Sequence, residues 1–271
     1  MSTFNVACIQ TTSSREVAAN IEAAGTLIRQ AADGGADFVL LPETVNLMEP
    51  KSALMREKAV PEADDPCLKA FQDLARETGI WLLAGSLVIV GEEGKTVNRS
   101  ILIGPDGGVQ ARYDKIHMFD VDLGDGEYYR ESKNYEPGSK AVTAELPWGR
   151  LGMSVCYDLR FPHLYRGLAK AGADFLSIPA AFTRPTGEAH WHVLQRARAI
   201  ENGCYVFAAA QCGVHDSGRK TYGHSLIIDP WGQVLADGGD EVGIISADID
   251  LGKVADARAK IPSLTHDRDI A

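Results

Sequence analysis

The chain has 271 residues, of which 45% are hydrophobic and 24% charged, so it can bury a full hydrophobic core. Its formal net charge of -10 and the absence of any cluster of Lys or Arg argue against a nucleic-acid partner. No apolar segment is long enough to span a bilayer, and the amino terminus lacks the basic and apolar regions of a secretion signal, so we expect a cytoplasmic protein without a membrane partner.

From the amino terminus onward, short β-rich segments alternate with helical patterns. A strand is predicted near 4–10, a helix near 15–33 that ends at Gly34-Gly35, and a second strand in DFVLLP (37–42). Strands that alternate with helices are typical of βαβ units. The segment from Leu251 onward is predicted to form a helix and a tail.

Three segments of the first half recur, in the same order, in the second half. GGADFVLLPE (34–43) resembles AGADFLSIPA (171–180), GIWLLAGS (79–86) resembles GCYVFAAA (203–210), and SILIGPDGGVQA (100–111) resembles SLIIDPWGQVLA (225–236). A single insertion between Glu43 and Gly79 accounts for the different spacing of the two series. The pattern therefore predicts an internal duplication.

This duplication predicts the architecture. Each half supplies strands, helices and a hairpin, and the turns GPDGG and DPWG suit a type I turn. When two mixed sheets each carry helices on one face, the other face of each sheet is buried if the two sheets pack against each other. We therefore expect an α/β fold, a four-layer α-β-β-α sandwich of two similar halves. No linker rich in Pro, Gly or Ser divides the halves, which favours a single domain over residues 1–271.

Two residues with catalytic chemistry follow matching strands. Glu43 ends FVLLP and Cys156 ends LGMSV, so a base and a thiol can meet at one end of the sandwich. Ala180 occupies the position equivalent to Glu43, which indicates that the strand itself does not need a carboxylate. Taken alone, Cys156 is either a nucleophile or a buried core residue, and Lys115 in RYDKIHMFD would ordinarily be a solvated surface residue.

The cysteines and histidines do not indicate a metal site. The five cysteines are odd in number and lack CxxC spacing, so neither a disulfide framework nor a structural zinc site is predicted. His190 and His192 lie two residues apart, on different faces of a predicted helix over 188–202. We expect no metal and no other cofactor. The same helix buries one face against the sheet or against a second subunit.

The segments LLPE, YDKIHMFDV, YRES and CYDLRFP resemble, in this order and spacing, the carbon-nitrogen hydrolase (nitrilase) superfamily. Further segments around 180–213 and 222–239 resemble its Nit branch of amidases, so the resemblance runs nearly end to end. It implies the α-β-β-α fold, a homodimer, Glu43 as general base, Lys115 as oxyanion stabiliser and Cys156 as nucleophile. The second glutamate of the family pattern falls on Glu131, with Glu127, one turn away, as the alternative.

The chemistry of such a site gives each residue a role. Glu43 takes the thiol proton, the Lys115 cation favours the thiolate, and Lys115 and the backbone N–H of Tyr157 hold the oxyanion formed on the amide. Collapse of this intermediate leaves a thioester and releases ammonia, after which Glu43 activates water.

The substrate contacts are less specific in the sequence. Arg160 lies four residues after Cys156 and can bind a carboxylate through its guanidinium, although a surface pair with Asp158 is the alternative. Phe182, Thr183 and Thr186, together with Tyr157, are expected to line the pocket. The resemblance implies a small amide that bears a carboxylate, with deaminated glutathione as the leading candidate, α-ketoglutaramate next, and an N-carbamoyl amino acid as a further alternative.

The sequence leaves one other mechanism and one other function open. A Cys-His dyad would use His190, His192 or His224 as base in place of Glu43. A binding or scaffold protein could keep the fold without activity, but it would have no chemical reason to retain Glu43 and Lys115 beside the cysteine.

Overall fold

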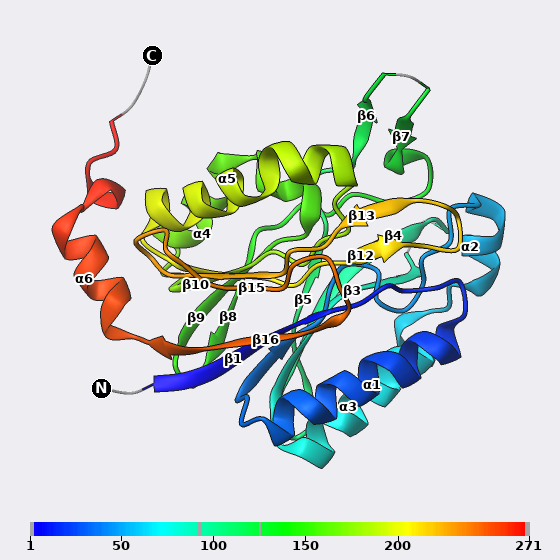
Figure 1. Ribbon diagram of the computed structural model, residues 1–271, viewed down its shortest axis with the longest axis horizontal. Helices are drawn as coiled ribbons and strands as arrows, with labels where there is room; N and C mark the ends of the chain where they lie inside the picture. The colour runs from blue at the N-terminus through cyan, green and yellow to red at the C-terminus, as the bar shows by residue number, and fades with distance from the viewer. Residues whose placement is uncertain (1–2, 92–93, 125, 269–271) are drawn as a thin grey trace.

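Two six-stranded sheets lie at the centre of the part of the chain that the computed structural model describes, residues 3–91, 94–124 and 126–268 (Figure 1). The first sheet has the order β16-β1-β2-β3-β4-β5, with β16 Gly243–Asp250, β1 Thr3–Gln10, β2 Phe38–Leu40, β3 Trp81–Val90, β4 Thr96–Ile103 and β5 Val109–Asp114. The second has the order β15-β14-β11-β10-β9-β8, with β15 Val234–Asp237, β14 Leu226–Ile228, β11 Tyr205–Ala208, β10 Phe175–Ser177, β9 Gly149–Met153 and β8 Val142–Leu146.

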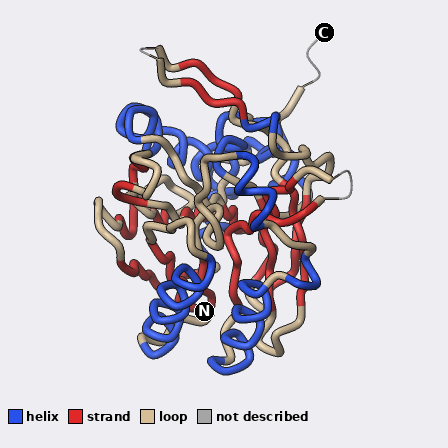
Figure 2. The backbone as a smooth tube through the Cα atoms, turned by 90° about the vertical axis from the view of Figure 1, so that its right-hand side faces the viewer, coloured by secondary structure: helices blue, strands red, loops and turns tan. Residues whose placement is uncertain are grey.

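Helices cover the outer face of each sheet. Helices α1 (Val17–Asp33) and α3 (Pro66–Thr78) lie on the first sheet, and α4 (Pro162–Lys170) and α5 (Arg184–Asn202) lie on the second (Figure 1). Figure 2 shows the strands between these helices in a view turned by 90°. The expected four-layer α-β-β-α sandwich is therefore confirmed.

The remaining elements connect the layers or border their ends. They are α2 (Ser52–Lys58), α6 (Gly252–Lys260), the hairpin of β6 (Asp120–Asp122) and β7 (Tyr128–Arg130), and the hairpin of β12 (Cys212–Val214) and β13 (Lys220–Tyr222). Within the described ranges, no helix has the length and apolar character needed to cross a bilayer.

The side chains of β1 alternate between two cores. Phe4, Val6 and Cys8 face the second sheet, whereas Ala7 and Ile9 pack beneath α1 and α3. This alternation follows from the period of two residues in a strand. Because both faces of β1 are apolar, its sequence is a nearly continuous hydrophobic run, which is typical of a sheet that is covered on both sides.

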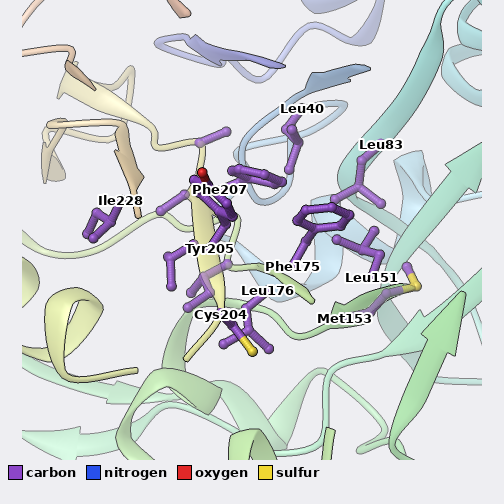
Figure 3. Packing of buried hydrophobic residues seen from close by; sticks show 14 of the residues in the cluster. Leu40, Leu83, Leu151, Met153, Phe175, Leu176, Cys204, Tyr205, Phe207 and Ile228 are labelled. Carbon is purple, nitrogen blue, oxygen red and sulfur yellow. The ribbon is translucent and has the colours of Figure 1, made fainter. Parts of the chain in front are cut away.

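Aromatic and aliphatic side chains fill the layer between the sheets (Figure 3). Phe175 and Phe207 stack with ring centroids 5.6 Å apart, and Leu40 and Leu83 of the first sheet lie in the same cluster. Each fully buried side chain of this size contributes roughly 1.5–3 kcal/mol to the free energy of unfolding. This packing holds the two sheets in the relative position on which the site described below depends.

The strand pairing supports the predicted duplication. Phe38 pairs with Trp81 in the first sheet and Phe175 pairs with Tyr205 in the second, at positions that the sequence repeat made equivalent. Each sheet also has an antiparallel edge strand next to its first parallel strand, β16 beside β1 and β8 beside β9. The sequence patterns did not identify β16, which returns from the far end of the chain. The predicted helix after Leu251 is α6.

A glycine shapes the backbone next to the end of β2. At Gly85, a β-bulge interrupts the pairing of β3 with β4, and a Cβ atom there would lie 1.7 Å from the carbonyl oxygen of Leu41. The neighbouring Ser86 accepts a hydrogen bond from the backbone N–H of Thr44 at 2.9 Å through its Oγ. The backbone of β3 therefore approaches the segment around Glu43 more closely than any larger residue allows.

We expect Gly85→Ala to lower the free energy of unfolding by about 1–3 kcal/mol, because backbone atoms cannot move aside as a flexible side chain can. Thermal and urea denaturation measure this loss. Gly167→Ala in α4 is the matched control, since a Cβ atom there meets nothing within 4 Å and alanine is the better helix former. Equal stability of the two variants would contradict the proposed close approach.

Candidate active site

Residues that follow four different strands meet at one cavity of about 880 Å³. Glu43 lies just beyond β2, Lys115 directly after β5 and Cys156 just beyond β9, and all three line this cavity together with Glu131. The strands β2, β9 and β10 belong to parallel pairs, so their carboxyl ends lie at the edge of the sandwich where α/β sheets commonly bind ligands.

Lys115 lies between two carboxylates. Its Nζ donates to Oε1 of Glu43 at 2.9 Å and to both carboxylate oxygens of Glu131 at 2.8 Å. Lys115 is only 2% exposed. A buried ammonium of this kind needs such partners, because burial without them would cost several kcal/mol.

Further donors hold the carboxylate of Glu43. The side-chain amide of Asn98 donates to Oε1 at 2.9 Å, and the backbone N–H of Ala181 donates to Oε2 at 2.8 Å. Ala181 follows β10 of the second sheet, whereas Glu43 belongs to the first. The carboxylate therefore joins the ends of the two sheets.

The structure separates the two glutamates that the sequence left as alternatives. Besides its bonds to Lys115, Glu131 accepts the backbone N–H of Phe119 at 2.6 Å. Glu127 accepts instead from the hydroxyl of Tyr129 at 2.9 Å, on the cavity wall. Glu131 is therefore the glutamate that contacts Lys115.

Cys156 has an unusual backbone conformation. Its φ is +51°, in the left-handed region that non-glycine residues rarely occupy, and its N–H donates to the carbonyl of Pro179 at 2.9 Å. Such a conformation costs roughly 1–3 kcal/mol and persists only where the surroundings hold it. It presents the thiol to the cavity at the start of a short 3-10 helix, Cys156–Arg160.

Asp158 holds this turn in place. Its Oδ2 accepts the N–H of Val155 at 2.9 Å and the hydroxyl of Tyr113 at 2.7 Å, and its Oδ1 accepts the N–H of His117 at 3.1 Å. The fully buried carboxylate thus ties the cysteine turn to the segment that carries Lys115. It does not form the surface pair with Arg160 that the sequence left open.

The surroundings determine which groups are charged. Burial raises the pKa of the Cys156 thiol well above its usual value, and the carboxylate of Glu43 raises it further, against the opposing effect of Lys115. Burial also acts to raise the pKa of Glu43, but the Lys115 cation and the hydrogen bonds of the cluster outweigh it and lower that pKa. The resting site therefore holds a neutral thiol beside a carboxylate, so the effect of Lys115 alone does not produce a thiolate.

Four of the five predicted substrate contacts line the cavity. They are Tyr157, Phe182, Thr183 and Thr186. The hydroxyls of Thr183 and Thr186 lie 2.8 Å apart and bond to each other at the start of α5. Tyr157 follows Cys156 in the first turn of the short helix, where backbone N–H groups have no acceptor within the helix.

Arg160 has a different position. Arg160 is not among the described residues that line the cavity. Its guanidinium lies 5.8 Å from the ring centroid of Tyr157 and 5.5 Å from that of Phe182, and its Nη2 lies 3.3 Å from Nδ1 of His190. Arg160 therefore packs against the aromatic wall rather than lining the cavity.

Sequence reasoning missed the two hairpins that border the cavity. Glu127 and Tyr129 come from the β6–β7 hairpin, and Arg219 from the turn between β12 and β13. Both hairpins are short and polar, and hydrophobic periodicity carries no signal for such segments.

The histidines considered as alternative bases lie elsewhere. In the described part of the chain, no histidine lines the cavity. His192 and His224 instead bond to the two carboxylate oxygens of Asp237, at 2.9 and 2.8 Å. Their ligand atoms lie within 4.8 Å of one another, so these three residues form a group that could hold a metal ion, and none of them lines the cavity.

We expect Lys115→Met to lower the free energy of unfolding by roughly 3–5 kcal/mol at neutral pH, since two buried carboxylates would lose their common cation. One carboxyl pKa would then rise above its value in the unfolded chain. The loss of stability is therefore largest at neutral pH and shrinks as the pH falls through that raised pKa. Urea denaturation across the acidic to neutral range measures it.

Two further variants test this interpretation. Adding Glu131→Gln to Lys115→Met removes one of the facing charges and should restore part of the stability. Lys260→Met is the surface control, because Lys260 pairs with Asp256 where both side chains are about 60% exposed. A Lys115→Met protein with wild-type stability at every pH would rule out an essential role for the ion cluster in folding.

Comparison with known proteins places this geometry in a family. The carbon-nitrogen hydrolase family model matches residues 5–259. The chain is 40% identical over 274 residues to the deaminated glutathione amidase of Yersinia enterocolitica, covering 100% of this chain and 95% of that protein. It is 37% identical over 268 residues to the omega-amidase NIT2 of Mus musculus, covering 99% of this chain and 96% of that protein.

Solved structures agree with the sequence relatives. The NitFhit protein of C. elegans has a TM-score of 0.93 and 38% identity, and the match covers 99% of this chain and 66% of that one. Nit3 of Saccharomyces cerevisiae has a TM-score of 0.87 and 30% identity, with 96% and 94% covered. The chain therefore belongs to the carbon-nitrogen hydrolase family and is a hydrolase that acts on C–N bonds.

Proposed function

We propose that this protein is a cysteine-dependent amidase that hydrolyses a small, carboxylate-bearing amide through a thioester. The observation that carries the proposal is the buried cluster of Glu43, Lys115 and Glu131 beside the thiol of Cys156 in one cavity. A base, a cation and a nucleophile within one water-poor site are the groups that acyl transfer requires.

The first half of the reaction begins with the neutral thiol. As the sulfur of Cys156 bonds to the amide carbon, the thiol proton passes to the carboxylate of Glu43, which the lowered pKa keeps ionised for this purpose. The carbonyl oxygen becomes an oxyanion. The Lys115 ammonium and the backbone N–H of Tyr157 stabilise it, and each well-placed donor is worth roughly 3 kcal/mol.

The second half reverses the proton transfer. The C–N bond breaks, the nitrogen leaves with the proton that Glu43 gives back, and the acyl group stays on sulfur as a thioester. Glu43 then takes a proton from water, whose oxygen attacks the thioester carbon. The C–S bond breaks, the acid leaves, and Glu43 returns this proton to the sulfur, which restores the thiol and the carboxylate. Glu131 contributes as a positioning residue, because it holds Lys115 and keeps it charged.

The relatives suggest two substrates that differ in their leaving groups. A deaminated glutathione amidase acts on a substituted amide, whose nitrogen would leave as an amine, whereas a primary ω-amide would release ammonia. The ammonia expected from the sequence therefore applies only to the second case. A cavity of about 880 Å³ is large enough for either class of acid.

We expect Cys156→Ala to fold normally and to release neither amine nor ammonia from deaminated glutathione or α-ketoglutaramate. Acid-quenched mass spectrometry should show an acyl adduct on the wild-type chain and none on the variant. Cys67→Ala is the matched control, because Cys67 is buried in α3 outside the cavity. Turnover near the wild-type rate in Cys156→Ala would exclude this nucleophile.

We also propose that the chain acts as a single cytoplasmic domain that forms a homodimer. All five cysteines are free, which suits a reducing compartment. The face of α5 exposes Val193 at 68% and Ile200 at 50%, and Trp231 in the β14–β15 turn is 57% exposed. Ile200 and this turn are adjacent, since a Cβ atom on Gly232 would lie 2.6 Å from Ile200. This apolar surface supports a second copy as its partner.

Ile200→Asp should therefore convert a dimer to a monomer, because it places a charge at the centre of that surface. Light scattering after size-exclusion chromatography measures the mass. Val214→Asp is the control, since Val214 is 61% exposed on the separate β12–β13 hairpin. A dimer that survives Ile200→Asp but dissociates with Val214→Asp would move the interface to the hairpin.

A further inference from the structure

The cavity wall contains more positive groups than the proposed reaction uses. Those that line it are Lys115, Arg130, Arg184, Arg219 and Lys220. Lys115 is held by two carboxylates, and Nη2 of Arg184 lies 3.5 Å from a carboxylate oxygen of Asp240. Nη1 of Arg130 donates to two carbonyl oxygens of its own hairpin. Lys115, Arg184 and Arg130 therefore already have partners in the protein.

Arg219 differs from these cations. Its Nη2 donates to the carbonyl oxygen of Ala181 at 2.6 Å, and its guanidinium lies 5.4 Å from the ring centroid of Tyr129. Its Nε is buried and has no hydrogen-bond partner, and across the described ranges no carboxylate forms an ion pair with it. Lys220 next to it is exposed, so water already solvates its charge.

The position of Arg219 relates it directly to the reacting groups. The carbonyl of Ala181 binds Arg219, and the N–H of the same residue binds the carboxylate of Glu43. Ala181 therefore links the guanidinium of Arg219 to the proposed base, Glu43, through its two backbone hydrogen bonds. Burial and Lys115 dominate the pKa of Glu43, and the charge of Arg219 adds a smaller lowering effect, which places both groups in one electrostatic environment.

A guanidinium that lines the cavity without a carboxylate partner among the described residues favours an anionic ligand. Arginine offers five N–H donors in a rigid plane, and the structure commits only part of them. A carboxylate fits such a plane through two parallel hydrogen bonds, and the part of Arg219 that lines the cavity can offer them. The net acidity of the chain repels anions in general, so capture of an acid needs a cation placed at the site.

We propose that Arg219 determines substrate specificity by binding the carboxylate at the far end of the amide substrate. This inference rests on the proposed amidase function and replaces Arg160 with Arg219 as the carboxylate-binding residue. It implies an acid in which a short carbon chain separates the carboxylate from the amide carbonyl, since both ends must fit between Arg219 and Cys156. The tether holds the amide at the thiol, which turns binding energy into rate.

A matched pair of amides tests the proposal. α-Ketoglutaramate carries the carboxylate, and 4-oxopentanamide has the same amide and ketone without it. We expect Arg219→Met to lower kcat/KM for the acid about 10- to 100-fold, mainly through KM, as the loss of charge-assisted hydrogen bonds predicts. The neutral amide should change less than about threefold. Arg219→Lys keeps the charge and should recover part of the loss.

Two control variants accompany these. Arg160→Met removes the rival arginine, and Arg29→Met removes a positive charge from the remote α1–α3 face, where Arg29 pairs with Glu77. Both should keep the wild-type preference for the acid. Equal losses on the acid and the neutral amide in Arg219→Met, or a selective loss on the acid in Arg160→Met, would overturn the assignment.

Binding separates failure of this inference from failure of the proposed function. Calorimetry with glutarate, an unreactive dicarboxylate, needs no turnover. If the wild type hydrolysed no amide, the amidase proposal would fall, yet glutarate binding that Arg219→Met abolishes would still support Arg219 as the carboxylate site. Glutarate binding that is unchanged in Arg219→Met would overturn the inference, whatever the activity.

Discussion

The buried ammonium of Lys115 is the interaction on which the site depends. It joins a carboxylate from the end of β2 to one from the β6–β7 segment, and none of these charges is stable in the interior without the others. The cluster lowers the pKa of the Glu43 carboxylate, whereas burial and that carboxylate raise the pKa of the neighbouring Cys156 thiol. In the mechanism that we propose, the thiol therefore loses its proton only as it attacks a carbonyl.

Backbone geometry brings these groups together with little freedom. Gly85 lets β3 approach the segment around Glu43, Ala181 reaches that carboxylate from the opposite sheet, and Asp158 fixes the turn of Cys156. Each contact joins segments distant in sequence. The two packed sheets place these side chains at their strand ends, and residues on such elements are positioned more precisely than residues on loops.

The cavity wall has two structural origins. The strand ends carry Glu43, Lys115 and Cys156, whereas the hairpins β6–β7 and β12–β13 carry Glu127, Tyr129 and Arg219. Hairpins tolerate substitution better than central strands.

The sequence by itself determined the layers, the duplication and the strand ends that carry Glu43 and Cys156, because hydrophobic periodicity and local turn chemistry are written in neighbouring residues. Lys115 needed a family pattern, since a lone charged residue has no local signature, and that pattern left Glu127 as an alternative to Glu131 until the structure separated them. Only the tertiary structure placed β16 beside β1, Arg160 against the rings of Tyr157 and Phe182, and Arg219 at the cavity. These positions depend on contacts between segments that are far apart in the chain, and such contacts form only when the two sheets pack together.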